Sequence, residues 1–205
     1  LAEGGWVVDD DNKPTVDTDE FKAAMNYYME LIGTGSAMSK DDVTASVDNG
    51  SAALAIGWPG WYVPTADSAA DYMVSPSMAK DGGKAYNTSE YGTWCLGIPQ
   101  NSPNPDLAME LLKYIMDPEV QLASIPNGGV PCRYSCLQNE DVLKDYPQLA
   151  TVCQALENGV YRPTISQWSE FPNILGAEMS NIMAGSKSVD DGLADAQAQL
   201  EALMQ

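Results

Sequence analysis

The stretch at residues 49–64, NGSAALAIGWPGWYVP, constrains the fold of this chain more than any other. An Asn-Gly turn comes first, and the apolar run at 52–56 then predicts a short strand covered on both faces, as in an α/β sheet. Two tryptophans, Trp58 and Trp61, follow among Gly and Pro. Because open α/β sheets bind ligands beyond the carboxyl ends of their strands, this turn is a candidate binding site.

Flat aromatic faces held in a Gly- and Pro-rich turn suit a flat, weakly polar ligand such as a sugar ring. The alternative is that these tryptophans only fill a gap beneath a loop. This stretch by itself leaves both interpretations open.

Charge and hydropathy exclude several classes of protein. The chain has 205 residues, of which 44% are apolar, enough for one sizeable domain or two small ones. Its net charge of -19 argues against binding nucleic acid or anionic lipid, both of which need clustered Lys and Arg. No apolar run approaches the roughly 20 residues of a membrane span. The sequence starts without Met or a signal peptide, so we expect a mature or truncated product.

The chain contains no histidine, which excludes Ser-His-Asp and Cys-His catalytic systems and His-containing zinc sites. The four cysteines, Cys95, Cys132, Cys136 and Cys153, lack the paired CxxC spacing of structural zinc. Cys132 and Cys136 are close enough in sequence to pair, whereas buried free thiols are the alternative for Cys95 and Cys153. The acidic turn at 9–12 lacks the Gly and terminal Glu of a calcium loop. We predict no metal, no cofactor and no catalytic residue.

Periodicity and capping signals predict a mixture of helices and short strands. A hairpin is expected at 6–16, strands at 52–56, 72–74 and 93–98, and a loop at 80–87. Helices are expected at 17–32, 40–48, 65–70, 105–116, 118–126, 139–145, 147–158, 171–184 and 188–204. Asp17 and Ser188 are the predicted caps of the first and last helices, with Glu20 and Asp191 as their partners three residues on.

The order of these pieces resembles a known family. An Asn-Gly turn is followed by a strand ending in GWPGW, a second strand, GTWCLGIP, NSPNPDLAMELLKYIMDPEVQ, GGVPCRYS, RPTISQWSEF and a capped final helix. This order is similar to the C-terminal half of extracellular solute-binding proteins of ABC importers, in the sugar-binding group that includes maltose-binding protein. The resemblance runs from about Gly4 to Met204.

The resemblance implies an α/β, periplasmic-binding-protein-like fold, with two lobes that close around a ligand by a hinge movement. This chain would form mainly the C-terminal lobe, with a helical excursion that belongs to the other lobe. Residues 1–91 would be the first part of the C-terminal lobe, and residues 130–205 its second part. Residues 92–129 would contribute a crossover strand and helices to the N-terminal lobe.

The resemblance also implies a set of ligand-binding residues: Trp58, Gly92, Trp94, Gly128, Gly129, Arg133 and Trp168. Tryptophans would stack on sugar faces, glycines would let the backbone approach the ligand, and Arg133 would donate paired hydrogen bonds to hydroxyls. Each role has an alternative. Trp94 could be core, Arg133 could pair with a carboxylate, and Trp61 with its neighbour Tyr62 could pack within their own helix.

The function implied is that of the substrate-binding component of an ABC importer, which delivers a sugar or oligosaccharide to the permease transmembrane subunits without catalysis. The alternatives are a fragment of a carbohydrate-active enzyme and a binding protein for a non-sugar solute. A periplasmic or extracellular location is expected, with lipid anchoring through a missing N-terminal segment as one form.

One helix raises a separate expectation. By the resemblance, the face of 105–116 that carries Leu107, Leu111, Leu112 and Ile115 points inward against strands of the first lobe, which this sequence lacks. Apolar side chains left in water cost about 1.5 to 3 kcal/mol each relative to burial. The segment could fold back on its own lobe, pair with a second copy of the chain or stay mobile, and of these we expect self-association through the Leu107–Ile115 helix.

Overall fold

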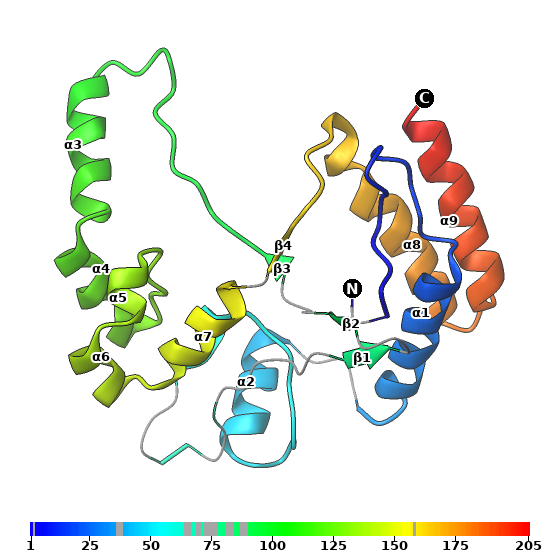
Figure 1. Ribbon diagram of the computed structural model, residues 1–205, viewed down its shortest axis with the longest axis horizontal. Helices are drawn as coiled ribbons and strands as arrows, with labels where there is room; N and C mark the ends of the chain where they lie inside the picture. Colours follow the sequence, from blue (N-terminus) through cyan, green and yellow to red (C-terminus); the bar gives the residue numbers. More distant parts are fainter. Residues whose placement is uncertain are drawn as a thin grey trace. The chain divides into compact units, whose positions relative to one another are not determined.

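A computed structural model describes residues 1, 3–35, 39–63, 67, 68, 71, 78–80, 84–86, 90–157 and 159–205. The chain divides into two compact units (Figure 1). The first contains Leu1–Ala37, Ser75–Glu90 and Val160–Gln205, and the second contains Met38–Val74 and Tyr91–Gly159. The lobe boundaries at 91/92 and 129/130 stay a prediction.

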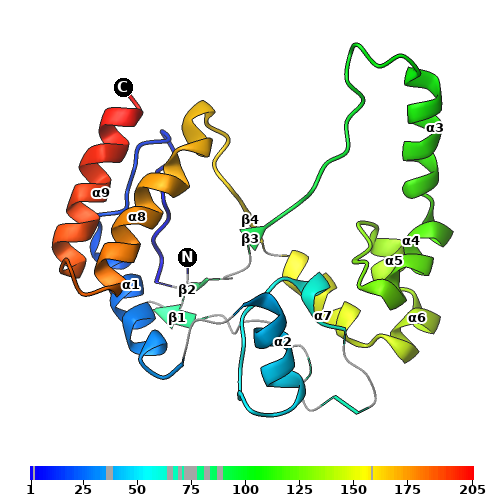
Figure 2. The same ribbon diagram turned by 180° about the vertical axis from the view of Figure 1, so that it is seen from behind.

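The first unit is built on three helices: α1 (Asp19–Ile32), α8 (Phe171–Met183) and α9 (Val189–Leu203). Figures 1 and 2 both show α8 and α9 side by side, and α1 also contacts α9. Leu193, Ala196 and Leu200 form a fully buried stripe on α9. The rest of this core comprises Val8, Val16, Met25, Phe171, Leu175 and Ile182. At about 1.5 to 3 kcal/mol for each fully buried leucine, the stripe stabilises the unit substantially.

The caps define where the outer helices begin. Ser188 caps α9 as predicted, because its Oγ accepts a hydrogen bond of 3.0 Å from the Asp191 backbone N–H. The predicted Asp17 cap of α1 is wrong by one residue. Thr18 has the extended backbone of an N-cap and accepts from the Phe21 N–H, whereas Asp17 lies 2.7 Å from the Lys22 ammonium instead.

The predicted hairpin at 6–16 is confirmed as a single antiparallel bridge between Val8 and Pro14. Gln197 of α9 ties this hairpin to the helix. Its Nε2 donates to the Pro14 carbonyl at 2.8 Å, and its Oε1 accepts from the Val16 N–H at 2.9 Å. One amide side chain therefore satisfies two backbone groups of a segment far away in the sequence.

The second unit is a set of short helices. They are α2 (Lys40–Asp48), η1 (Pro59–Trp61), α3 (Pro105–Ile115), α4 (Pro118–Ser124), η2 (Ile125–Asn127), α5 (Tyr134–Leu137), α6 (Glu140–Asp145) and α7 (Gln148–Leu156). Its core comprises Ile125, Leu137, Leu149, Val152 and Cys153. The helices predicted at 40–48, 105–116, 118–126, 139–145 and 147–158 are all present within one or two residues of their ends. None of the helices in the described ranges has both the length and the apolar character of a membrane span.

Strand content in the described residues is small. Strands β1 (Met78–Lys80) and β2 (Lys84–Tyr86) pair antiparallel, with Met78 opposite Tyr86. Their presence overturns the loop predicted at 80–87, because an Asp-Gly-Gly sequence between short runs also suits a hairpin. A second two-stranded sheet joins β3 (Glu90–Tyr91) and β4 (Val160–Tyr161). The predicted strand at 72–74 and most of the predicted helix at 65–70 lie outside the described residues.

Two predicted strands, at 52–56 and 93–98, are not formed. Leu54 and Ile56 are 78% and 94% exposed, and Trp94 is fully exposed. A strand is stable only when a neighbouring backbone accepts and donates its hydrogen bonds. No described segment supplies that neighbour to either run, so apolar sequence alone does not make them strands.

The apolar face of α3 is uncovered at Leu107 and Leu111, in line with the expectation that this sequence lacks its partner strands. Leu107 and Leu111 are 66% and 56% exposed, and Tyr114 beside them is exposed as well. The helix itself forms because Pro105 stands in its first turn and its residues are good helix formers.

All four cysteines are free thiols in the structure. Cys132 and Cys136 are not bonded to each other. Cys153 is buried, whereas Cys95 is exposed, contrary to the buried alternative for that residue.

An ion pair joins α8 to the segment before α9. The Lys187 ammonium lies 2.6 Å from Glu178 Oε2 and 2.7 Å from Asp195 Oδ2. The hydrogen bond from Lys187, followed by one from Asn181, lowers the pKa of the Glu178 carboxyl from its ordinary value of 4.5. The folded state therefore favours the ionised form of this buried carboxylate.

We expect the Glu178→Gln variant to have a lower melting temperature than the unmodified chain at pH 7. A group whose pKa is lower in the folded state stabilises the fold above its unfolded pKa, and this stabilisation disappears as the pH falls through the folded pKa. The difference in melting temperature should therefore narrow once the pH falls below 4.5. Thermal unfolding from pH 7 to pH 3 measures this, with Glu30→Gln on α1 as the exposed control. A difference that stays constant across that range would contradict the assignment.

Candidate functional site

The tryptophan-rich turn at 57–62 belongs to the second unit and is held by its own backbone. Pro59 begins η1, Trp58 is its N-cap, and the Trp61 N–H donates to the Trp58 carbonyl at 2.9 Å. A Cβ on Gly57 would stand only 2.9 Å from Trp61 Cε3, so glycine lets this ring fold back over its own turn. Trp58 and Trp61 remain 44% and 38% exposed.

Tyr62 anchors the end of this turn to α2. Its hydroxyl donates to Asp48 Oδ1 at 3.1 Å, so Tyr62 does not pack solely within its own turn. Burial is the main cause that raises the pKa of the Tyr62 hydroxyl, and the hydrogen bond to Asp48 adds to the rise. The phenol therefore remains a neutral donor at physiological pH.

Gly92 receives the ring of Trp58. A Cβ at position 92 would overlap the outer edge of the indole, at atoms Cη2 and Cζ3. Two of the residues predicted to bind ligand are therefore in contact, although they lie 34 positions apart in the sequence (92 − 58 = 34).

A second close approach joins the turn at 57–62 to the turn that follows η2. A Cβ on Gly60 would lie 3.2 Å from the Gly128 carbonyl oxygen, and a Cβ on Gly128 would lie 3.3 Å from the Gly60 carbonyl oxygen. Gly128 has a φ of +83° and closes η2 in the left-handed conformation, which favours glycine. Gly129 follows directly, and its N–H donates to the Ser124 carbonyl.

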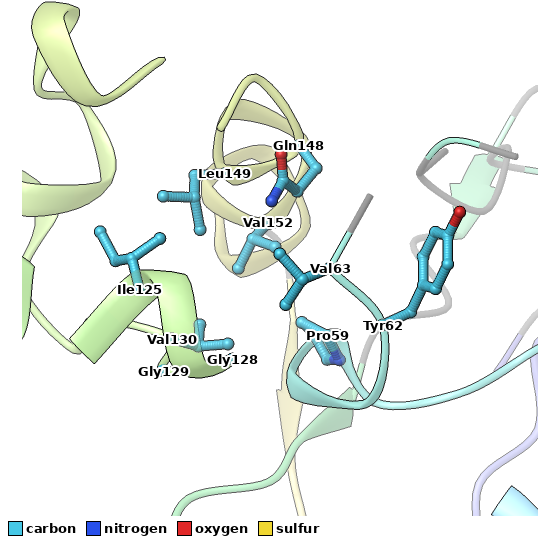
Figure 3. A pocket seen from close by; sticks show the side chains of 10 residues that line it. All are labelled: Pro59, Tyr62, Val63, Ile125, Gly128, Gly129, Val130, Gln148, Leu149 and Val152. Atoms are coloured by element: carbon cyan, nitrogen blue, oxygen red, sulfur yellow. The ribbon is translucent and has the colours of Figure 1, made fainter. Parts of the chain in front are cut away.

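These two turns and the start of α7 line a small, mostly apolar pocket (Figure 3). The lining residues are Pro59, Tyr62, Val63, Ile125, Gly128, Gly129, Val130, Gln148, Leu149 and Val152. Gln148 is the polar exception and is only 6% exposed. No hydrogen-bond partner for its amide is present among the residues that the structure describes, and Figure 3 shows this amide beside Val63 and Val152.

The other predicted site residues are placed differently. Trp94 is fully exposed, which argues against its core alternative. Arg133 donates from Nε to the Met116 carbonyl at 2.8 Å and forms no ion pair with a described carboxylate. Trp168, in η3 (Ser166–Ser169) of the first unit, stacks on Phe171 with ring centroids 5.4 Å apart and packs against the core of that unit.

The sequence predicted the turn at 57–62 and the segments that contain Gly92 and Gly128 as parts of the site. It did not predict Val63, Gln148 and Val152. A Pro-Gln pair at a helix start predicts only the helix, so no sequence signal distinguished Gln148. Chemically, the arrangement offers half-exposed indole surface and backbone rather than a nucleophile. No group of three acidic or cysteine residues in the described ranges is placed to hold a metal ion.

Comparisons with known sequences agree on one family. Residues 1–151 match a family model described as bacterial extracellular solute-binding protein. A probable amino-acid ABC transporter periplasmic-binding protein of Sinorhizobium fredii is 21% identical over 98% of this chain and 47% of its own length. A probable ABC transporter-binding protein of Deinococcus radiodurans is 25% identical over 87% of this chain and 44% of its own length. The chain thus spans about half the length of the curated relatives that it matches.

Solved structures show the same fold. The maltose-bound MalE3 of T. maritima superposes with a TM-score of 0.83 at 22% identity, covering 98% of this chain and 55% of that one. A solute-binding protein of Agrobacterium radiobacter in complex with ribitol gives a TM-score of 0.81 at 22% identity, with coverages of 98% and 54%. A solute-binding protein of Thermotoga lettingae bound with α-D-tagatose gives 0.80 at 20% identity, with coverages of 100% and 54%. The periplasmic-binding-protein-like fold is therefore confirmed.

The unpartnered amide of Gln148 gives a test of the pocket. Among the described residues only an Asp17 oxygen is both fully buried and without a hydrogen-bond partner, so the Gln148 amide keeps contact with solvent. We therefore expect Gln148→Leu to change the free energy of unfolding by less than about 1 kcal/mol. Gln121 is the matched control, because it is similarly buried but accepts a hydrogen bond of 3.1 Å from the Cys132 N–H. Gln121→Leu should lower the free energy of unfolding by about 1 to 3 kcal/mol. Urea unfolding measures both, and equal losses in the two variants would show that the Gln148 amide has a partner.

Proposed function

The chain belongs to the bacterial extracellular solute-binding protein family, and on that premise we propose that it holds a sugar or oligosaccharide as part of an ABC importer's substrate-binding component. The observation that carries the sugar class is Trp58. Its indole is nearly half exposed, is fixed in a glycine- and proline-rich turn, and rests on Gly92. A rigid aromatic face that remains open to solvent suits the apolar face of a sugar ring.

The similar solved structures support the same class. The ligands bound in them are maltose, ribitol and α-D-tagatose, all polyhydroxylated. The Sinorhizobium fredii relative is instead described for amino acids, so a non-sugar solute is the competing proposal. Maltose, ribitol, tagatose and a mixture of amino acids are therefore the first ligands to test.

We further propose that Gly128, Gly129, Trp94 and Arg133 contribute to the same ligand site, with Trp168 as an additional aromatic surface. The ABC permease transmembrane subunits are the proposed membrane partner. The proposed location is the periplasm or the cell exterior, with lipid anchoring as one form.

The family favours binding without catalysis, since the relatives are described as binding proteins. A glycosidase would need two carboxylates placed on either side of the substrate. Of the carboxylates nearest to aromatic motifs, Glu90 is paired with Arg162, and Glu170 accepts a hydrogen bond from Asn173. No described feature therefore favours the enzyme alternative.

Trp58→Ala should weaken binding of whichever ligand the panel identifies. Loss of a stacked aromatic costs about 1 to 3 kcal/mol by analogy with base stacking, or about five- to 150-fold in affinity. Isothermal titration calorimetry measures the change, and circular dichroism confirms that the variant is folded. Unchanged affinity would contradict the proposed site.

Trp168→Ala tests the aromatic surface of the first unit. Because Trp168 stacks on Phe171 and contacts the core, we expect a lower melting temperature as well as weaker binding. Loss of both thermal stability and affinity would distinguish Trp168→Ala from Trp58→Ala, which should weaken binding alone. If Trp168→Ala changes stability alone, this tryptophan is structural and leaves the proposed ligand site.

We also propose that the exposed apolar face of α3 mediates self-association. Leu107, Leu111 and Tyr114 lie along that face and line a shallow surface depression. We expect a concentration-dependent dimer in sedimentation velocity at micromolar concentration. Leu111→Glu should shift the chain to monomer, whereas Lys113→Gln on the same helix should not. A strictly monomeric unmodified chain would overturn this proposal.

A further inference from the structure

We propose that Gly92 is a positioning residue for Trp58, and that the absence of a side chain at 92 sets the orientation of the indole that a ligand meets. This inference rests on the proposed function, because it concerns the aromatic surface of the proposed ligand site. It assigns to Gly92 a role different from direct backbone contact with the ligand.

The backbone end of Trp58 is fixed. Its backbone caps η1, its carbonyl accepts from the Trp61 N–H, and Pro59 follows with its restricted φ. The Trp58 ring can still turn about its two side-chain torsions, so its orientation depends on what it contacts beyond the turn.

Gly92 is one of the residues that the ring contacts there. Atoms Cη2 and Cζ3, the part of the indole farthest from the backbone, occupy the space that a Cβ at 92 would fill. Any side chain at 92 would displace the ring rather than the backbone, because the overlapping atoms belong to the movable end of Trp58. The substitution should therefore alter the site and leave the fold intact.

Trp58 also remains accessible to a ligand, because the residue keeps an exposed fraction of 44%. Gly92 thus lies against the indole of Trp58. A ligand that stacks on this ring in one orientation will lose affinity when a side chain at position 92 displaces the ring.

The segment after Gly92 offers a matched control. Gly97 lies in the same stretch of chain, and a Cβ built there meets no atom within 4 Å. Gly97→Ala therefore changes the backbone entropy in the same way as Gly92→Ala without touching an aromatic ring.

The first experiment needs no ligand. The chain has five tryptophans, and each gives one indole N–H signal in a two-dimensional nitrogen–proton NMR spectrum. Trp58→Phe identifies the Trp58 signal by its loss. We expect Gly92→Ala to move that signal and to leave those of Trp6 and Trp168 in place, and Gly97→Ala to leave all three in place. A Trp58 signal that does not move in Gly92→Ala would overturn the inference.

The second experiment is a double-mutant cycle with the ligand from the maltose, ribitol and tagatose panel. Gly92→Ala should weaken binding by a factor within the five- to 150-fold range expected for Trp58→Ala. In the Trp58→Ala background it should have little further effect, because the ring that it displaces is gone. An equal loss in both backgrounds would show that Gly92 contacts the ligand directly and would overturn the inference.

The two measurements separate the two proposals. If Trp58→Ala leaves affinity unchanged, or no member of the panel binds, the proposed sugar site fails while the NMR result still decides whether Gly92 positions the ring. If Trp58→Ala weakens binding but Gly92→Ala does not move the Trp58 signal, the proposed sugar site is supported and the positioning role of Gly92 is refuted.

Discussion

Burial of the apolar stripe of α9 is the interaction on which the first unit depends. Leu193, Ala196 and Leu200 are fully enclosed, and they lie against α8 and α1. Gln197 stands on the same helix and ties down the hairpin that contains Pro14. One helix therefore supplies apolar contacts to α1 and α8 and also hydrogen bonds to the backbone of a distant segment.

The second unit depends on glycines rather than on a single helix. Its turns meet where side chains are missing: Gly57 under Trp61, Gly60 against Gly128, and Gly92 under Trp58. Close-packed interiors leave no spare space at such contacts. The candidate site is therefore defined as much by absent Cβ atoms as by the aromatic rings.

Local signals in the sequence predicted the helices well, because caps and apolar spacing act within a few residues. Ser188 is an example, and so is the break at Gly128. The strands predicted at 52–56 and 93–98 failed because a strand needs a partner that local sequence does not specify. Trp58 and Gly92 were predicted to belong to one site but not to touch, and the place of Gln148 in the pocket was missed. Both features depend on packing between distant segments, which local sequence does not specify.

The bond between Gln197 and the Val16 N–H also bears on the order of synthesis, because the two residues are 181 positions apart. During synthesis the hairpin and α1 are made before the helix that covers them, because α9 follows them in the chain. Folding that relies on such distant contacts is slow, because a long loop must close before the contact forms. The first unit therefore cannot complete its core until α9 has been made, and until then its hairpin and α1 remain accessible to chaperones and proteases that act on unfolded chains.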